Sequence, residues 1–240
     1  MSNLISSTEN KLIKRVKKIL KGDKTHFVIE GKNIIQEAIN NNIEIEQIFE
    51  LNNTNLFKNS IKITDNVLKA IASAKSPEGF VALCKKQENY TVGKNIVFCD
   101  NVQDPGNIGT IIRSAIAFGY DTIFTNVNVY NPKIIRSTQG AIFKINIINY
   151  SDSKEEIAKL AKTNKIYITT LDKDSKPYNT ISYPRSNKVI VLGNEGHGVN
   201  KELYSFATEK VYIPIEFESL NVAVAGGIIL SRTYNGENNE

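Results

Sequence analysis

Hydrophobic and polar positions follow two different periods along the chain, and this mixture predicts an α/β protein. Apolar residues recur at helical spacing between Leu12 and Leu20, directly after the capping-box sequence Ser6-Ser7-Thr8-Glu9, which predicts an amphipathic helix. Short β-rich runs and helical runs then alternate as far as residue 84. We expect strands at 26–30, 43–51, 61–63 and 80–84, and helices at 34–39 and 64–74.

A second alternating segment begins at residue 95. We expect strands at 95–101, 122–126, 165–170, 188–192 and 210–214, and helices at 109–118, 153–162, 201–206 and 220–234. This order predicts a parallel sheet covered on both faces, in which ligands bind at the carboxyl ends of the strands. Residues 85–94 are polar and lack a period. We therefore predict a smaller N-terminal α/β domain over 1–88, a linker over 89–94 and a second domain over 95–240.

Composition excludes several classes of protein. Hydrophobic content of 41% and charged content of 23% are close to globular averages. The longest apolar runs are far shorter than the ~18 residues of a membrane span, and the N-terminus lacks the pattern of an export signal. We expect Cys84 and Cys99 to be buried in a protein of the reducing cytoplasm. With only His26 and His197 available, the spacing predicts no metal site.

The positive charge lies in the first segment. Residues 1–94 carry fifteen basic and ten acidic side chains, whereas residues 95–240 carry fifteen of each. Seven of the basic residues fall between Lys11 and Lys24, a density that attracts a polyanion. A solvated helix face is the alternative explanation. The predicted RNA-binding residues are Lys11, Lys14, Arg15 and Lys18.

Polar residues gather in a loop that follows the first strand of the second segment, between Asn101 and Arg113. A structural turn requires Pro105 and Gly106, but it does not require two asparagines, an aspartate and an arginine. We expect Arg113 to point toward the loop or a cleft. The alternative is an ordinary ion pair with Asp104.

Two further loops have the same character. The glycine spacing from Gly193 to Gly198 differs from both the dinucleotide fingerprint and the Walker loop, and it surrounds Glu195. His197 in this turn is expected to be a turn residue rather than a base. In the third loop, Ser219 or Asn221 can cap a helix whose small residues permit close packing or a subunit interface.

In order and spacing, the three loops resemble the three motifs of the SpoU/TrmH RNA 2′-O-ribose methyltransferases. The residues that carry this resemblance are Asn101, Asn107, Gly109 and Arg113, then Leu192, Gly193, Glu195, Gly196 and Gly198, then Ile213, Pro214, Ser219, Leu220, Asn221, Val222 and Ala225. Residues 8–14, 27–31 and 76–82 resemble the ribosomal-protein-like substrate-binding domain of many members. The resemblance implies a C-terminal SPOUT sheet with a deep trefoil knot, in a homodimer formed through that domain.

The resemblance also implies a cofactor and its site. Matching the family's motifs, the catalytic positions are Asn107, Arg113, Glu195, Ser219 and Asn221. The S-adenosylmethionine pocket is implied at Thr170, Leu192, Gly193, Asn194, Gly198, Ile213, Ser219 and Leu220. Because a guanidinium scarcely loses a proton, we expect Arg113 to bind phosphate and stabilise the developing alkoxide, with Glu195 orienting it or relaying the proton.

The expected function is 2′-O-ribose methylation of RNA, with 23S ribosomal RNA favoured because of the N-terminal domain. The alternatives are a tRNA 2′-O-methyltransferase and a non-catalytic RNA-binding protein of ribosome assembly. A protein that binds nucleotide phosphates through the glycine loop is excluded by the absence of a motif lysine.

Overall fold

The structure is a computed structural model that describes residues 4–87, 91–216 and 218–234. Contacts within the chain group it into two compact units. The first unit comprises Met1–Asn89 and Val129–Phe143, and the second comprises Tyr90–Asn128 and Lys144–Glu240. A short segment from the middle of the sequence therefore packs with the N-terminal unit.

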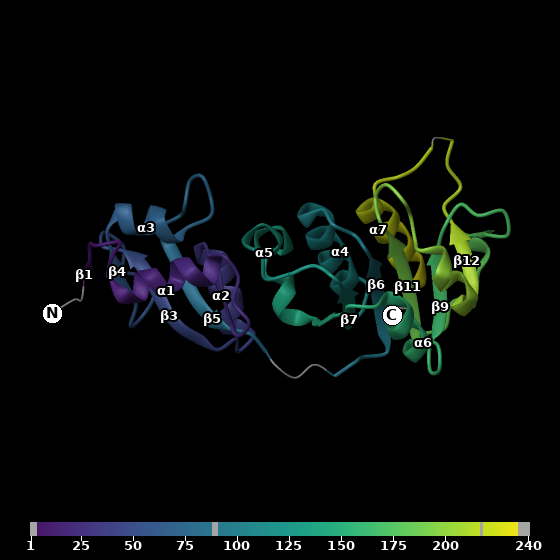
Figure 1. The fold of residues 1–240 in the computed structure, drawn as a ribbon, viewed down its shortest axis with the longest axis horizontal. Helices are drawn as coiled ribbons and strands as arrows, with labels where there is room; N and C mark the ends of the chain where they lie inside the picture. The colour runs from purple at the N-terminus through teal and green to yellow at the C-terminus, as the bar shows by residue number, and fades with distance from the viewer. Residues whose placement is uncertain (1–3, 88–90, 217, 235–240) are drawn as a thin grey trace, which may run out of the picture. The chain divides into compact units, whose positions relative to one another are not determined.

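The first unit contains a five-stranded mixed sheet in the order β1-β4-β3-β5-β2, and Figure 1 labels its strands β1, β3, β4 and β5. Its strands are β1 (Leu4–Ile5), β2 (His26–Glu30), β3 (Ile45–Leu51), β4 (Ile61–Ile63) and β5 (Phe80–Lys85). Its helices are α1 (Lys11–Leu20), α2 (Lys32–Asn40), α3 (Asp65–Ile71) and α5 (Pro132–Thr138). The apolar faces of α1 and α3 form one core with the sheet, in which Ile13, Val16 and Phe49 are fully buried.

The second unit contains a seven-stranded sheet in the order β10-β12-β9-β11-β6-β7-β8, and every neighbouring pair is parallel. Its strands are β6 (Asn95–Asp100), β7 (Thr122–Thr125), β8 (Asn146–Asn149), β9 (Lys165–Thr169), β10 (Lys176–Pro177), β11 (Lys188–Gly193) and β12 (Glu209–Tyr212). Its helices are α4 (Pro105–Ala117), α6 (Ser153–Leu160) and α7 (Val222–Thr233), with 3-10 helices η2 (Tyr178–Thr180) and η3 (Lys201–Phe206). A further 3-10 helix, η1 (Ala141–Lys144), precedes β8.

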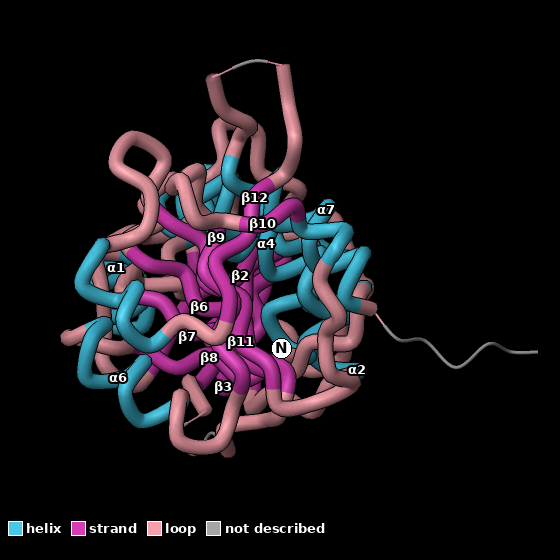
Figure 2. Tube along the Cα trace, turned by 90° about the vertical axis from the view of Figure 1, so that its right-hand side faces the viewer, coloured by secondary structure: helices cyan, strands magenta, loops and turns pink. Residues whose placement is uncertain are grey.

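Helices cover both faces of the parallel sheet, and Figure 2 distinguishes the strands from the helices and loops around them. On one face α6 and η3 pack against the strands, burying Ile157 and Leu203. On the other face α4 and α7 pack together and α7 contacts β11. Gly226 of α7 lies so close to Leu192 that an added Cβ would come within 2.9 Å of its Cδ1. The predicted α/β class with a parallel sheet and a smaller α/β unit is confirmed.

Several elements differ from the sequence predictions. Helix α1 begins after Asn10, whose Oδ1 accepts a hydrogen bond from the amide of Leu12 at 2.9 Å, so the expected capping box does not form. Residues 201–206 form a 3-10 helix rather than an α-helix. Strands β1, β8 and β10 and helix α5 were not predicted. The three strands are two to four residues long, too short for a hydrophobic period to be distinguished.

Both cysteines are buried and free, as predicted. Burial raises the pKa of each thiol to about 12, so neither is a ready nucleophile at neutral pH. Among the described residues, no helix has the length and apolar character that crossing a membrane would require.

Glu50 of β3 is a fully buried carboxylate that organises the loop between β3 and β4. It accepts hydrogen bonds from the amide of Leu56 at 2.5 Å, the hydroxyl of Ser60 at 2.6 Å and the ammonium of Lys62 at 3.1 Å. Burial alone would raise the pKa of Glu50, but these hydrogen bonds outweigh it and lower the pKa to about 2. The carboxylate therefore stabilises the folded unit while it is ionised.

We expect Glu50→Gln to lower the free energy of unfolding by about 2–3 kcal/mol at pH 7, because the charged hydrogen bonds are lost. The unfolded carboxyl titrates near pH 4.3 and the folded one near 2, so the wild type loses this stabilisation as the pH falls from about 5 toward 2. Urea unfolding at pH 7 and pH 3 measures both effects. An equal difference between the two proteins at both pH values would contradict this role.

Candidate active site

The first two polar loops lie side by side because they follow neighbouring parallel strands. Strands β6 and β11 are paired so that Asp100 lies opposite Gly193. The loops that begin at Asn101 and Asn194 therefore leave the same edge of the sheet. Asn194 Nδ2 donates a hydrogen bond of 2.8 Å to the carbonyl oxygen of Asn101, which joins the two loops at their origin.

The carboxylate of Glu195 is held by the first loop. Its Oε1 accepts hydrogen bonds from Asn107 Nδ2 at 2.9 Å and from the amide of Asp104 at 3.2 Å, and its Oε2 accepts one from the amide of Gln103 at 3.4 Å. Desolvation raises the pKa of Glu195, but these hydrogen bonds outweigh it and the pKa lies below its ordinary value. Glu195 is therefore ionised at neutral pH and is a weak base.

The third loop joins the same group through Asn221. The Nδ2 of Asn221 donates a hydrogen bond of 2.9 Å to Asn107 Oδ1. Its Oδ1 caps α7 by accepting from the amides of Ala223 at 2.9 Å and Val224 at 3.2 Å. Asn221, Asn107 and Glu195 thus form one continuous hydrogen-bonded chain that connects all three loops.

The glycine loop is a tight turn with an internal backbone bridge. Asn194 and Gly198 exchange two backbone hydrogen bonds, of 3.0 and 2.9 Å. Asn194 Oδ1 also accepts from the amides of Gly196 at 2.9 Å and His197 at 3.1 Å. His197 is exposed and lies in the turn, as predicted. The close approach of Gly193 and Gly198 explains the glycine at 193, where an added Cβ would lie 2.2 Å from the carbonyl carbon of Gly198.

Arg113 lies on α4 and its side chain is exposed. Among the described residues, no side chain or backbone group forms a hydrogen bond or ion pair with it. The alternative ion pair with Asp104 does not form, because Asp104 caps α4 and accepts from the amide of Asn107 at 2.9 Å. Arg113 keeps its hydrogen-bonding capacity for a ligand.

Several of the residues predicted to bind a cofactor lie at three neighbouring strand ends. Thr170 follows β9, Ile213 follows β12, and Leu192 and Gly193 end β11. Since these strands are adjacent and parallel, their carboxyl ends share one edge. Thr170 Oγ1 is hydrogen-bonded to the hydroxyl of Tyr204 at 2.8 Å. Ser219 and Leu220 are exposed, and in the part of the chain that the structure describes Ser219 has no hydrogen bond to the Asn221–Asn107–Glu195 chain.

The same edge offers a suitable surface for a small ligand that has both an apolar and a polar part. Leu171 is 63% exposed directly after Thr170, and Leu220 is 37% exposed. Gly198 has open space where a side chain would lie. Exposed apolar side chains beside a glycine turn with open space can contact the apolar part of such a ligand, so these residues fit an adenosine-type ligand. Within the described ranges, no group of three or more His, Cys, Asp or Glu side chains could hold a metal ion.

Sequence analysis did not single out the residues that support these loops. Asp100 is 1% exposed and accepts a hydrogen bond of 2.7 Å from the amide of Asn200, beyond the glycine turn. Asn126 and Tyr150 both bond to Asn101. Asp100, Asn126 and Tyr150 each end or directly follow a strand, at the same edge of the sheet as the polar loops. This position at a strand end is the one feature of the sequence that could have identified them.

The fold and the three connected loops define a SPOUT-type methyltransferase architecture, and comparisons with known proteins agree. The SpoU rRNA Methylase family matches residues 94–231. The chain is 31% identical to the 23S rRNA (guanosine(2553)-2′-O)-methyltransferase RlmP of Bacillus subtilis, over 94% of this chain and 97% of that protein. The protein belongs to the SpoU rRNA methylase family.

Solved structures share the fold over the whole chain. The crystal structure of an rRNA methyltransferase from Sinorhizobium meliloti superimposes with a TM-score of 0.83 at 24% identity, covering 96% of each chain. An AdoMet-bound crystal structure of an rRNA methyltransferase from the same organism superimposes with a TM-score of 0.82, also at 24% identity and 96% coverage of each chain. In both comparisons, the residues covered include the N-terminal unit as well as the parallel sheet.

Gly193→Ala tests the geometry of the glycine turn. We expect the new methyl group to force apart the Gly193 and Gly198 backbones and to lower the free energy of unfolding by about 1–3 kcal/mol or more. Gly196→Ala is the matched control, because its Cβ would meet only Asn194 Oδ1 at 3.6 Å, an ordinary contact. Urea unfolding of both variants measures the difference, and equal stability would contradict the close approach.

Proposed function

We propose that this protein transfers a methyl group from S-adenosylmethionine to a ribose 2′-hydroxyl of 23S ribosomal RNA. The observation that carries this proposal is the hydrogen-bonded chain of Asn221, Asn107 and Glu195, which ties all three family motifs to one edge of the sheet. The name of the Bacillus subtilis relative favours 23S RNA over tRNA, and it makes the position equivalent to guanosine 2553 the first to assay.

The proposal assigns separate tasks to the two parts of the sequence. Residues 1–88 bind the RNA substrate, and residues 95–240 form the SPOUT domain with its trefoil knot. Residues 89–94 are the linker between these two domains. A homodimer formed through the C-terminal domain completes the site, and the enzyme works in the cytoplasm. On α7, Val224 is 52% exposed and the small residue Ala225 is partly exposed, and this face of the helix supports the dimer because it allows another helix to approach closely.

S-adenosylmethionine, when bound, supplies an electrophilic methyl group. The residues proposed to hold it are Thr170, Leu192, Gly193, Asn194, Gly198, Ile213, Ser219 and Leu220. A ribose hydroxyl is a poor nucleophile, so the chain's own residues must orient it and stabilise the negative charge that develops on its oxygen. Arg113, which has no hydrogen-bond partner among the described residues, can donate to that oxygen and to the adjacent phosphate. Glu195, ionised and fixed by Asn107, orients these groups, and the hydroxyl proton is released to solvent water as the methyl group is transferred.

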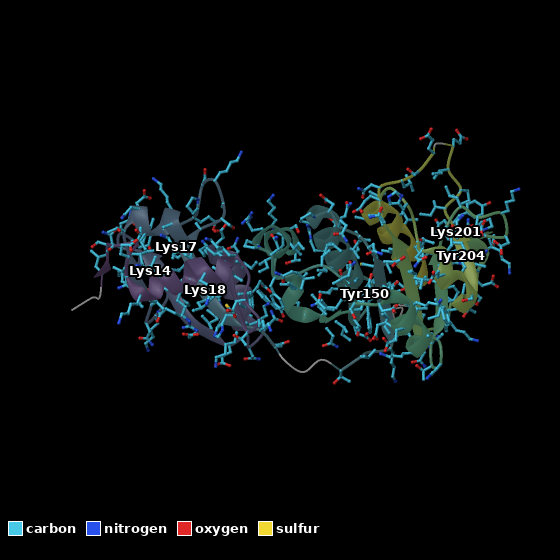
Figure 3. The ribbon with its side chains drawn as sticks, in the orientation of Figure 1. Lys14, Lys17, Lys18, Tyr150, Lys201 and Tyr204 are labelled. Atoms are coloured by element: carbon cyan, nitrogen blue, oxygen red, sulfur yellow. The ribbon has the colours of Figure 1, made fainter. Side chains whose placement is uncertain are left out.

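The basic face of α1 is the proposed RNA-binding surface. Figure 3 shows Lys14, Lys17 and Lys18 along this helix, and the side chains of Lys11, Lys14 and Lys18 are exposed. Lys14 forms an exposed ion pair with Glu9 at 2.6 Å, which RNA phosphate can replace at little cost. Arg15 is bound by both oxygens of Glu46 and lies 3.3 Å from His26 Nε2, so its contribution to RNA binding is the smallest of the four predicted residues.

Transfer of a labelled methyl group tests the function directly. Purified protein is incubated with S-adenosylmethionine and, separately, with 23S ribosomal RNA, assembled large subunits and tRNA from a strain that lacks the gene. We expect label in a 23S ribose, mapped by its resistance to alkaline cleavage. Label in tRNA alone would favour the tRNA alternative. Binding of RNA with no transfer to any substrate would favour the non-catalytic alternative.

Arg113→Ala tests the assigned role of the guanidinium. We expect this variant to bind S-adenosylmethionine as the wild type does, because the proposed pocket is formed by other residues, and to lose at least about a hundredfold in methyl transfer. Calorimetry and the transfer assay measure the two properties. Arg185→Ala, which removes another exposed arginine of the same unit, is the control. Undiminished transfer by Arg113→Ala would defeat the assignment.

Replacing Lys11, Lys14 and Lys18 together by Gln tests the RNA-binding surface. We expect weaker RNA binding and a plot of log Kd against log salt concentration whose slope is smaller by about 2, since each lost phosphate contact removes about 0.7–0.9. Replacing Lys154, Lys159 and Lys162 by Gln removes the same charge from the second unit and is the control. An equal change of slope in both triple variants would place the binding surface elsewhere.

A further inference from the structure

Tyr150 is a buried residue that connects two strands of the parallel sheet which are not neighbours. It directly follows β8, whereas its hydroxyl reaches the end of β6, with β7 lying between them in the sheet order. The hydroxyl donates a hydrogen bond of 2.9 Å to the carbonyl oxygen of Cys99 and accepts one of 3.2 Å from the amide of Asn101. The ring stacks on Phe98 at a centroid distance of 4.7 Å. Figure 3 labels Tyr150 within the second unit.

Asn101, whose amide donates to the Tyr150 hydroxyl, begins the first polar loop and contacts the residue that begins the second. Its backbone is left-handed, with φ of 57°, a conformation that asparagine tolerates better than most residues. Its carbonyl oxygen accepts from Asn194 Nδ2 at 2.8 Å, and its Oδ1 accepts from Asn126 Nδ2 at 2.5 Å. Groups that follow β7, β8 and β11 therefore all bond to this one residue of the β6 loop.

Tyr150 and Asn101 influence the position of Glu195 only indirectly. None of the hydrogen bonds of Tyr150 or Asn101 reaches the Glu195 carboxylate within the described structure. Asn101 instead holds Asn194, the residue immediately before Glu195, and it begins the loop whose amides at Gln103 and Asp104 bind the Glu195 carboxylate. A shift of Asn101 would move both sides of this contact relative to each other.

We propose that Tyr150, acting through Asn101, is a positioning residue that aligns Glu195 and Asn107 for methyl transfer. The expected effect of Tyr150 on methyl transfer rests on the proposed function. The structural part of the inference stands on the hydrogen bonds alone: without the Tyr150 hydroxyl, the amide of Asn101 loses its acceptor, and Asn101 is held less firmly by its remaining contacts with Asn126 and Asn194.

Tyr150→Phe keeps the ring and removes only the hydroxyl. We expect kcat for methyl transfer to fall at least about tenfold, because misplacement of about 1 Å can cost about a hundredfold, while KM for the RNA stays within about twofold, since the proposed RNA-binding surface lies on α1. Tyr183→Phe is the matched control: its hydroxyl also donates to a backbone carbonyl oxygen, that of Tyr178 at 3.0 Å, and Tyr183 precedes β11, at the opposite end of that strand from the loop that begins at Asn194. We expect its kcat to remain unchanged.

A double variant separates positioning from general loss of stability. If Tyr150 acts through Glu195, Tyr150→Phe should cost little further activity in a Glu195→Gln background, because the contact that it aligns is already weakened. A full tenfold further loss in that background, or an unchanged kcat in the single variant, would overturn the proposal.

Hydrogen exchange of the full chain without cofactor provides a readout that does not depend on activity. We expect faster exchange at residues 101–104 and 194–198 in Tyr150→Phe than in the wild type, and no change there in Tyr183→Phe. Asn101→Gly, which tolerates the left-handed backbone but lacks the side-chain oxygen, should accelerate exchange in the same segments. If the wild type transfers no methyl group, the proposed function fails and exchange alone decides the positioning. Unchanged exchange in Tyr150→Phe would overturn it.

Discussion

The parallel pairing of β6 with β11 is the constraint on which the rest of the site depends. Because Asp100 and Gly193 are opposite each other, two loops more than ninety residues apart in the sequence begin side by side. Only then can Asn107 reach Glu195, and only then can Asn221 at the start of α7 reach Asn107. An antiparallel arrangement would place these loops at opposite edges of the sheet, and the same residues could not meet.

The electrostatics of Glu195 follow from that arrangement. Three donors from one loop bind a carboxylate whose desolvation would otherwise favour its neutral form. Glu195 is therefore an ionised acceptor that holds its neighbours in place. A carboxyl that transfers protons near neutral pH typically has a raised pKa instead. Arg113 is exposed and has no hydrogen-bond or ion-pair partner among the described residues. It is therefore the complementary group that can bind a developing negative charge.

Much of the fold could be predicted from the sequence, because hydrophobic period and turn chemistry are local. The parallel sheet, the buried cysteines and the polar loops at strand ends were all predicted from such patterns. The cap of α1 at Asn10 was missed because Ser6-Ser7-Thr8-Glu9 satisfies the same rule a few residues earlier. Strand β8 was missed because its four residues begin and end with asparagine. The contact of Tyr150 with Asn101 joins strands that are not neighbours, and no spacing in the sequence encodes it.

The most direct test of this account is the pKa of Glu195, measured by carbon-detected NMR titration of the full chain without cofactor. We expect a pKa below the ordinary value of a glutamate and a shift back toward that value in Asn107→Ala, because the shortest of the three hydrogen bonds is then missing. A Glu195 pKa at or above the ordinary range, or one that Asn107→Ala leaves unchanged, would contradict the convergence of the three loops on this carboxylate.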